Sequence, residues 1–161
     1  LGSRRSGCPV EAHVLRITRS RDGTFGLGLL SGRFDTAQVL HEVERAYRAG
    51  DLLPGMTSLV VYEPGLEVAH VSVADLIEIR DCVARHESAC PGPYRGLFVA
   101  AEREAEIVAR VYAATWHGAA AEPPMHDVAA TLWEAELRLA TGALSEQLAA
   151  LRCAPVTRRL A

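Results

Sequence analysis

Histidines and cysteines are the side chains of this sequence best suited to bind a metal ion or move a proton. No two of the six histidines have the i, i+4 spacing that places two imidazoles on one face of a helix. The sequence therefore predicts no metal site and no cofactor. It places the histidines in solvent or at helix ends: His13, His41, His70, His86, His117 and His126.

The four cysteines give the same indication. Cys8, Cys82, Cys90 and Cys153 lie far apart, without the Cys-x-x-Cys spacing of zinc sites or the pattern of a disulfide framework. Cys82 lies in a helical pattern, where a thiol is usually a small buried side chain. This usage is typical of a reducing compartment, so we expect a cytoplasmic protein.

Signatures of catalysis and nucleotide binding are missing from the sequence. There is no Gly-x-Ser-x-Gly elbow, and because the chain contains no lysine it cannot form a Gly-Lys-Ser/Thr phosphate loop. Gly26-Leu27-Gly28 matches part of a dinucleotide fingerprint, but it lies in a strand pattern without the third glycine and the following helix. The sequence therefore favours a binding protein over an enzyme.

Length and composition narrow the class of protein further. A chain of 161 residues is the size of one domain. With 49% hydrophobic residues, 23% charged residues and a net charge of −3, it is neither a disordered chain nor a strongly basic nucleic-acid binder. No apolar run approaches the roughly 18 residues of a membrane-spanning helix. We expect a disordered or added terminus over 1–11, an α/β domain over 12–140, and an additional helix and tail over 141–161.

The elements that must position any site alternate along the chain. An extended run from residue 12, the turn Asp22-Gly23 and a second run to residue 31 predict an antiparallel hairpin. Glycine on one face of the second strand indicates that another element lies close there. Strands then alternate with helices, which predicts a mostly parallel sheet with right-handed crossovers. The expected helices are 36–49, 72–86, 102–116, 131–140 and 141–152, and the expected strands between them are 58–62, 96–100 and 125–128.

Several of these segments resemble the SpoIIAA-like family, which includes the STAS domains of anti-sigma-factor antagonists and small STAS/CRAL-TRIO-like bacterial proteins. The resemblance covers residues 12–140. It rests on five short strings: Gly32-Arg33-Phe34-Asp35, Leu59-Val60-Val61-Tyr62, Val71-Ser72-Val73-Ala74-Asp75-Leu76, Gly92-Pro93 before Phe98-Val99-Ala100, and Trp133 in the penultimate helix.

The resemblance implies a regulatory module that acts through protein–protein contacts at the start of the second helix. The expected switch region is Ser72, Ala74, Asp75 and Leu76. The family's usual phospho-acceptor positions hold Val73 and Ala74 here, so we expect no standard phosphorylation switch. Ser72 is the one hydroxyl residue left, and its alternative role is that of a helix N-cap.

Two ligand sites are also open at this stage. A crevice at the carboxyl ends of the parallel strands would be lined by polar loop residues, which otherwise are ordinary solvated side chains: Glu63, Glu67, His70 and Arg103. An apolar cavity in the C-terminal half would suit a small hydrophobic, lipid-like ligand, as in CRAL-TRIO carriers. Its lining, which otherwise is plain core, would be Tyr112, Trp116, Met125 and Trp133.

The last expected helix, over 141–152, carries Leu144, Leu148 and Leu151 on one stripe. A helix of three turns is marginal alone and must bury such a stripe. It can do so against its own sheet or against a second subunit. We predict a homodimer with this helix in the interface.

Overall fold

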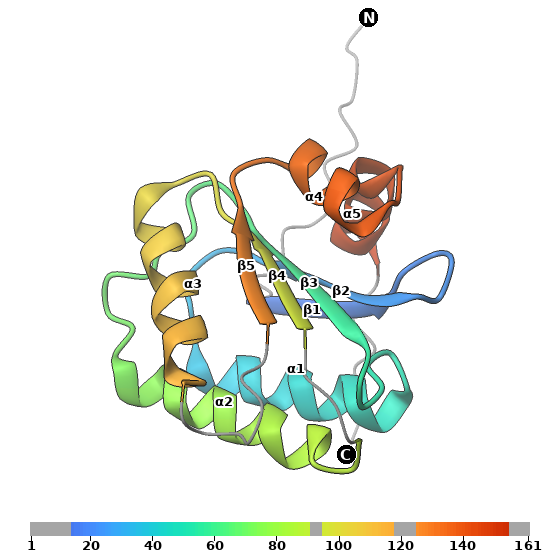
Figure 1. The fold of residues 1–161 in the computed structure, drawn as a ribbon. Helices are drawn as coiled ribbons and strands as arrows, with labels where there is room; N and C mark the ends of the chain where they lie inside the picture. The colour runs from blue at the N-terminus through green and yellow to red at the C-terminus, as the bar shows by residue number, and fades with distance from the viewer. Residues whose placement is uncertain (1–13, 91–94, 118–124, 155–161) are drawn as a thin grey trace, which may run out of the picture.

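Five strands form one sheet of order β1-β2-β3-β4-β5 in the computed structural model, which describes residues 14–90, 95–117 and 125–154. Strands β1 and β2 are antiparallel, and the three remaining pairs of neighbouring strands are parallel (Figure 1). The predicted α/β class with an N-terminal hairpin is therefore confirmed. The strands are β1 (Leu15–Arg19), β2 (Phe25–Leu30), β3 (Thr57–Tyr62), β4 (Arg95–Val99) and β5 (Met125–Ala129).

Parts of the sequence predictions lie outside the described residues: the terminus over 1–11, Gly92-Pro93 of the family resemblance, and the tail from 155.

The turn of the hairpin is built on Asp22 and Gly23. The Asp22 carboxylate accepts hydrogen bonds from the hydroxyls of Ser20 and Thr24, both at 2.7 Å, and from the Thr24 amide at 3.1 Å. These bonds, above all the one from Ser20, lower the pKa of Asp22. Gly23 has a φ of +74°, a conformation that a side chain disfavours. The Asp-Gly turn predicted from the sequence is confirmed.

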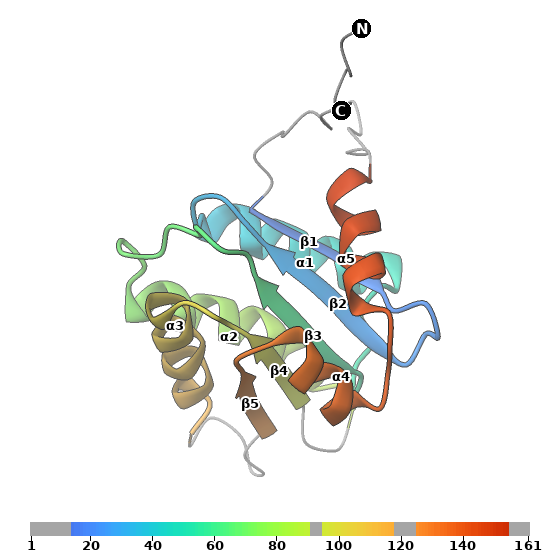
Figure 2. The same cartoon turned by 90° about the horizontal axis from the view of Figure 1, so that it is seen from above.

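Helices cover both faces of the sheet (Figure 2). On one face, α1 (Thr36–Ala49), α2 (Val73–Glu87) and α3 (Arg103–Thr115) are the crossovers between parallel strands. On the other face lie α4 (Leu132–Leu139) and α5 (Leu144–Cys153). Crossovers of one handedness between successive neighbouring strands place their helices on the same face, which explains why the first three helices lie together.

The strands divide the core into two layers because side chains alternate along them. In β2, Phe25, Leu27 and Leu29 point towards α4 and α5. The intervening Gly26 and Gly28 point towards the α1–α3 face. A Cβ on Gly26 would overlap the side chain of Leu52, which follows α1. The glycines in this strand predicted that another element lies close to it, and the structure confirms this.

The stripe of α5 covers the sheet of its own chain, so these leucines do not form a dimer interface, and the homodimer itself stays a prediction. Leu144 and Leu148 are completely buried, and Leu151 is nearly so, in the core layer between the sheet and the helices α4 and α5, and α5 itself lies over β1 and β2. Arg16 in β1 also donates to the carbonyl oxygens of Leu151 and Ala154, at 2.8 and 2.7 Å, at the end of α5. Folding back onto its own sheet, which is the arrangement that competes with dimerisation, buries the whole apolar stripe without the entropy cost of association.

Among the described residues, none of the helices combines the length and the apolar character needed to cross a membrane.

Candidate functional site

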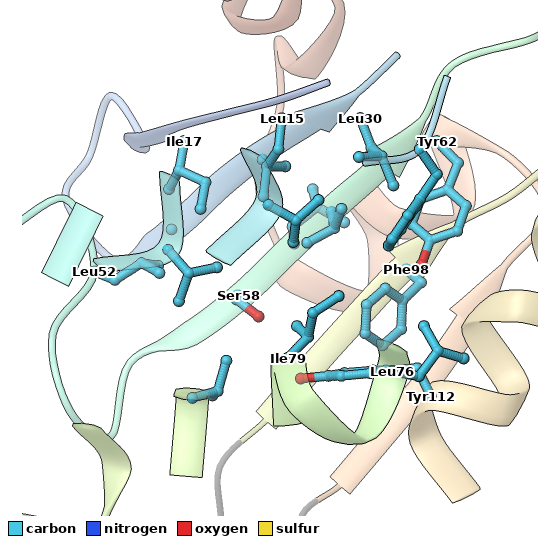
Figure 3. A pocket seen from close by; sticks show the side chains of 18 of the residues that line it. Leu15, Ile17, Leu30, Leu52, Ser58, Tyr62, Leu76, Ile79, Phe98 and Tyr112 are labelled. Carbon is cyan, nitrogen blue, oxygen red and sulfur yellow. The ribbon is translucent and has the colours of Figure 1, made fainter. Parts of the chain in front are cut away.

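A partly open apolar cavity of about 80 Å³ lies between the sheet and the helices α1 and α2 (Figure 3). Its floor comes from β1, β2 and β3, and its roof comes from the two helices. The apolar side chains of the floor and roof include Leu15, Ile17, Leu30, Val39, Val43, Val60, Leu76, Ile79 and Val83.

Gly28 explains why the space exists. At this position of β2 the core face carries no side chain, and an added Cβ would lie 3.4 Å from Val60 Cγ2 and 3.5 Å from Leu15 Cδ1, which is van der Waals distance. Leu52 fills the corresponding space over Gly26. The helix residues that line the cavity opposite β2 include Val39 and Val43 of α1.

One end of the cavity is aromatic. Phe98 packs edge-to-face against Tyr62 and Tyr112, with ring centroids 6.2 and 5.7 Å apart. Burial raises the pKa of Tyr62 far above its usual range, so its hydroxyl stays protonated. Figure 3 shows these rings at the end opposite Ile17 and Leu52. The wall therefore combines aliphatic surface with phenolic groups.

An unfilled apolar cavity lowers stability. At about 24 cal/mol per Å³, a space of about 80 Å³ costs roughly 2 kcal/mol relative to a filled core. A molecule that supplies the missing contacts would regain part of this free energy.

The structure does not bring all four residues of the predicted apolar site to one cavity. Tyr112 does line the cavity, and Trp116 is buried beyond it, with ring centroids 6.4 Å apart. Trp133, however, lies in α4 across the sheet and is 68% exposed. Met125 begins β5, and its side chain lies outside the described residues. Large aromatic residues were an incomplete signal, since aliphatic side chains and two glycines form much of the wall.

His126 also differs from the prediction that the histidines lie in solvent or at helix ends. It lies within β5, with its ring 5.5 Å from Trp116 and 5.8 Å from Tyr112, centroid to centroid. Burial lowers the pKa of His126 to about 4. The ring occupies the space above Gly96, where a Cβ would come within 2.5 Å of Nδ1.

The polar crevice residues do not gather into one site. Glu63 accepts a hydrogen bond from Arg152 of α5, and Glu67 pairs with Arg33 at 3.8 Å. His70 Nε2 lies 2.6 Å from the carbonyl oxygen of Phe34. Arg103 is the first residue of α3. Glu63 thus contacts α5, whereas Glu67 and His70 both contact the segment that leads into α1.

The predicted switch region divides between surface and core. Ser72 caps α2 in a capping box: its hydroxyl accepts from the Asp75 amide at 3.2 Å, and Asp75 Oδ2 accepts from the Ser72 amide at 2.8 Å. The hydroxyl of Ser72 also lowers the pKa of Asp75. Ala74 is exposed, whereas Leu76 is buried and lines the cavity. Leu76 therefore cannot contact a partner at the surface.

The fold and this cavity define an α/β protein with three helices on one face of a mostly parallel sheet, two on the other, and an apolar space under the first two. In comparisons with known proteins, no family model, curated protein or solved structure matches the chain. The resemblance to SpoIIAA-like domains therefore stays a prediction from the sequence.

Proposed function

We propose that this protein binds a small apolar molecule, or the apolar end of a larger one, in the cavity between the sheet and helices α1 and α2. The cavity itself is the observation that carries the proposal. An engineered apolar cavity of about 150 Å³ binds benzene or xenon. The space here, about 80 Å³, holds a few carbon atoms without rearrangement.

The chemistry of the wall favours such a ligand. Each methylene group that moves from water into apolar surroundings contributes about 0.8 kcal/mol. Tyr62 and Tyr112 add phenolic groups at one end, and Ser58 of β3 adds a hydroxyl to the wall. An acyl or alkyl chain end with one polar atom fits this combination of aliphatic surface and hydroxyl groups.

Xenon is the simplest probe of the space. We expect the chemical shift of dissolved ¹²⁹Xe to show saturable binding to the wild-type protein. Gly28→Ala, which adds a methyl group inside the cavity, should weaken that binding several-fold. Gly142→Ala is the matched control, because its Cβ meets no atom within 4 Å.

Native mass spectrometry of protein purified without detergent then searches for the natural ligand. An adduct that is lost in Gly28→Ala and kept in Gly142→Ala supports the proposal. A clean ligand-free mass together with no saturable xenon response would overturn it.

A second candidate function is protein binding through the start of α2, as the family resemblance implies. Val73 is 57% exposed and Ile77 is 36% exposed, one helical turn apart, beside the exposed Ala74. A partner recovered at fixed stoichiometry with wild type should be lost with Ile77→Glu. It should be kept with Ile107→Glu, which changes an equally apolar exposed position on α3. Loss with both variants, or with neither, would contradict this function.

A further inference from the structure

The outer sides of α1 and α2 bring together a carboxylate, a thiol and an imidazole. Glu44 lies in α1, and Cys82 and His86 lie one turn apart in α2. Glu44 Oε1 is 3.3 Å from Cys82 Sγ, and Glu44 Oε2 is 3.0 Å from His86 Nε2. One donor atom from each of the three residues lies within 4.8 Å of the others.

We propose that Glu44, Cys82 and His86 form a binding site for a divalent cation of the zinc class. Zinc bonds of 2.0–2.3 Å in a tetrahedron separate neighbouring donor atoms by roughly 3.3–3.8 Å. Of the two separations in the structure, 3.3 Å lies at the lower end of that range and 3.0 Å lies below it. Because all three donor atoms lie within 4.8 Å of one another, a cation in place of the shared protons requires the donor atoms to approach by no more than about 1 Å.

The ligand types select the metal. Thiolate and imidazole favour zinc over magnesium and calcium, which prefer sets of oxygen ligands. When the cation binds, the Cys82 S–H bond breaks, the sulfur bonds to the metal and the proton passes to solvent. One thiolate and one carboxylate then balance the two positive charges.

The surroundings already hold the imidazole in place. The ring of His86 stacks on Tyr47 with centroids 4.2 Å apart and planes 8° from parallel. Cys82 is 1% exposed, whereas Glu44 and His86 are partly exposed. Burial on one side and access on the other are what a site needs to exclude bulk water and still admit an ion.

A groove between the two helices gives access to the fourth coordination position. Glu44 and Cys82 line it together with His41, Asp81 and Arg85. Arg85 lies 3.7 Å from Glu44 Oε1, but its side chain is 67% exposed and can move into solvent as a cation enters. Three protein ligands with a position open to water or to another ligand is the arrangement of exchangeable zinc sites.

A bound ion would also link the two helices that roof the apolar cavity, since Val43 and Val83 on their inner sides line it. The inference does not depend on an apolar ligand, because the three metal ligands lie outside that cavity.

Cobalt is the probe for this site, because thiolate-to-cobalt charge-transfer absorption reports a bound cysteine and the d–d bands report tetrahedral geometry. We expect the intact chain to bind one Co²⁺ with both signatures and to release it to Zn²⁺. Cys82→Ser should abolish the charge-transfer band. Glu44→Gln and His86→Gln should each weaken binding about tenfold or more. Cys153→Ser and His70→Gln are the matched controls and should bind as wild type does.

Cys82 is buried, so Cys82→Ser could fold poorly for reasons unrelated to the metal. Glu44→Gln and His86→Gln change partly exposed side chains and therefore test the site independently. Wild-type affinity in both Glu44→Gln and His86→Gln would overturn the proposal. So would a charge-transfer band that survives Cys82→Ser or disappears in Cys153→Ser. A chain that takes up no Co²⁺ at all would show that the cluster is only a hydrogen-bonded link between the helices.

Discussion

Tyr47 of α1 and His86 of α2 stack almost in parallel, 4.2 Å between ring centroids. The Tyr47 hydroxyl also donates a 2.5 Å hydrogen bond to Glu87 Oε1, and Glu87 Oε2 accepts from the amide of Gly55 at 2.7 Å. Tyr47 thus connects the end of α2 to α1, and Glu87 connects it to the turn before β3. The two helices over the cavity are held at this end by one aromatic stack and one carboxylate.

Tyr47→Ala should lower the free energy of unfolding by about 2–3 kcal/mol, because it removes both the stack and the hydrogen bond. Tyr47→Phe keeps the ring and should cost only about 1 kcal/mol. Urea denaturation followed by circular dichroism measures both values. Equal losses in the two variants would show that the stack contributes nothing.

Substitution by alanine should change the stability of the fold in opposite directions at two glycines of the sheet, Gly28 in β2 and Gly96 in β4. Gly28→Ala places a methyl group at 3.4 Å or more from its neighbours, so it should stabilise the fold by about 0.5–1 kcal/mol. Gly96→Ala forces a Cβ to within 2.5 Å of the His126 ring and should destabilise it by about 1–3 kcal/mol. Thermal unfolding of the pair tests the prediction. A destabilised Gly28→Ala variant would mean that the space above that residue is already filled.

The order of elements was predictable because local signals agree with the tertiary structure. Asp22-Gly23 predicts the hairpin, and Asp35 and Gly50 cap α1 as their types suggest, with the Asp35 carboxylate accepting from the Gln38 amide at 2.9 Å. Glycine in β2 correctly indicated close approach. The choice between fold-back and dimerisation for α5 was not predictable, because an apolar stripe has the same pattern whichever surface covers it.

The candidate sites were harder to predict because they depend on contacts between segments. Glu44 and Cys82 are 38 positions apart, and the helix packing that joins them has no local signature. The i, i+4 spacing of Cys82 and His86 was a usable signal, but a search restricted to pairs of histidines or pairs of cysteines misses it. Gly28 leaves the cavity wall without a side chain on β2, which a search for large aromatic residues does not detect, although that search did find Tyr112.

The buried imidazole of His126 should make stability depend on pH. Its pKa is about 4 in the folded protein and about 6.5 in the unfolded chain, so the unfolded chain binds the proton more readily. Its contribution is complete above pH 6.5 and is lost as the pH falls from 6.5 to 4. We expect a decrease of about 2 kcal/mol between pH 7 and pH 5 from this residue.

His126→Phe, which keeps a ring in the aromatic cluster, should remove that part of the pH dependence. His41→Gln, at an exposed position of α1, should retain it. Urea denaturation of the three proteins at both pH values gives the comparison. An unchanged difference between the two pH values in His126→Phe would assign the effect to other groups.

Ser72 should behave as a helix cap. Ser72→Ala removes the hydroxyl that accepts from the Asp75 amide, so it should cost about 1 kcal/mol of unfolding free energy. Ser145→Ala, at an exposed position of α5, should be nearly neutral. If Ser72→Ala is equally neutral in chemical denaturation, the capping box contributes no stability and a different role for the hydroxyl gains support.

Leu148 provides the sharpest test of how α5 is used. The side chain is completely buried against the sheet, so Leu148→Asp places a carboxylate in an apolar layer and should cost about 4 kcal/mol or more. Ala149→Asp adds the same charge at the next, exposed position and should change stability little. Denaturation and sedimentation of both variants distinguish the two arrangements of the helix. In the fold-back arrangement, Leu148→Asp unfolds at lower denaturant, whatever the oligomeric state of the wild type. A Leu148→Asp protein of unchanged stability that dissociates from dimer to monomer would instead place the stripe between subunits, and the packing of α5 on its own sheet would be wrong.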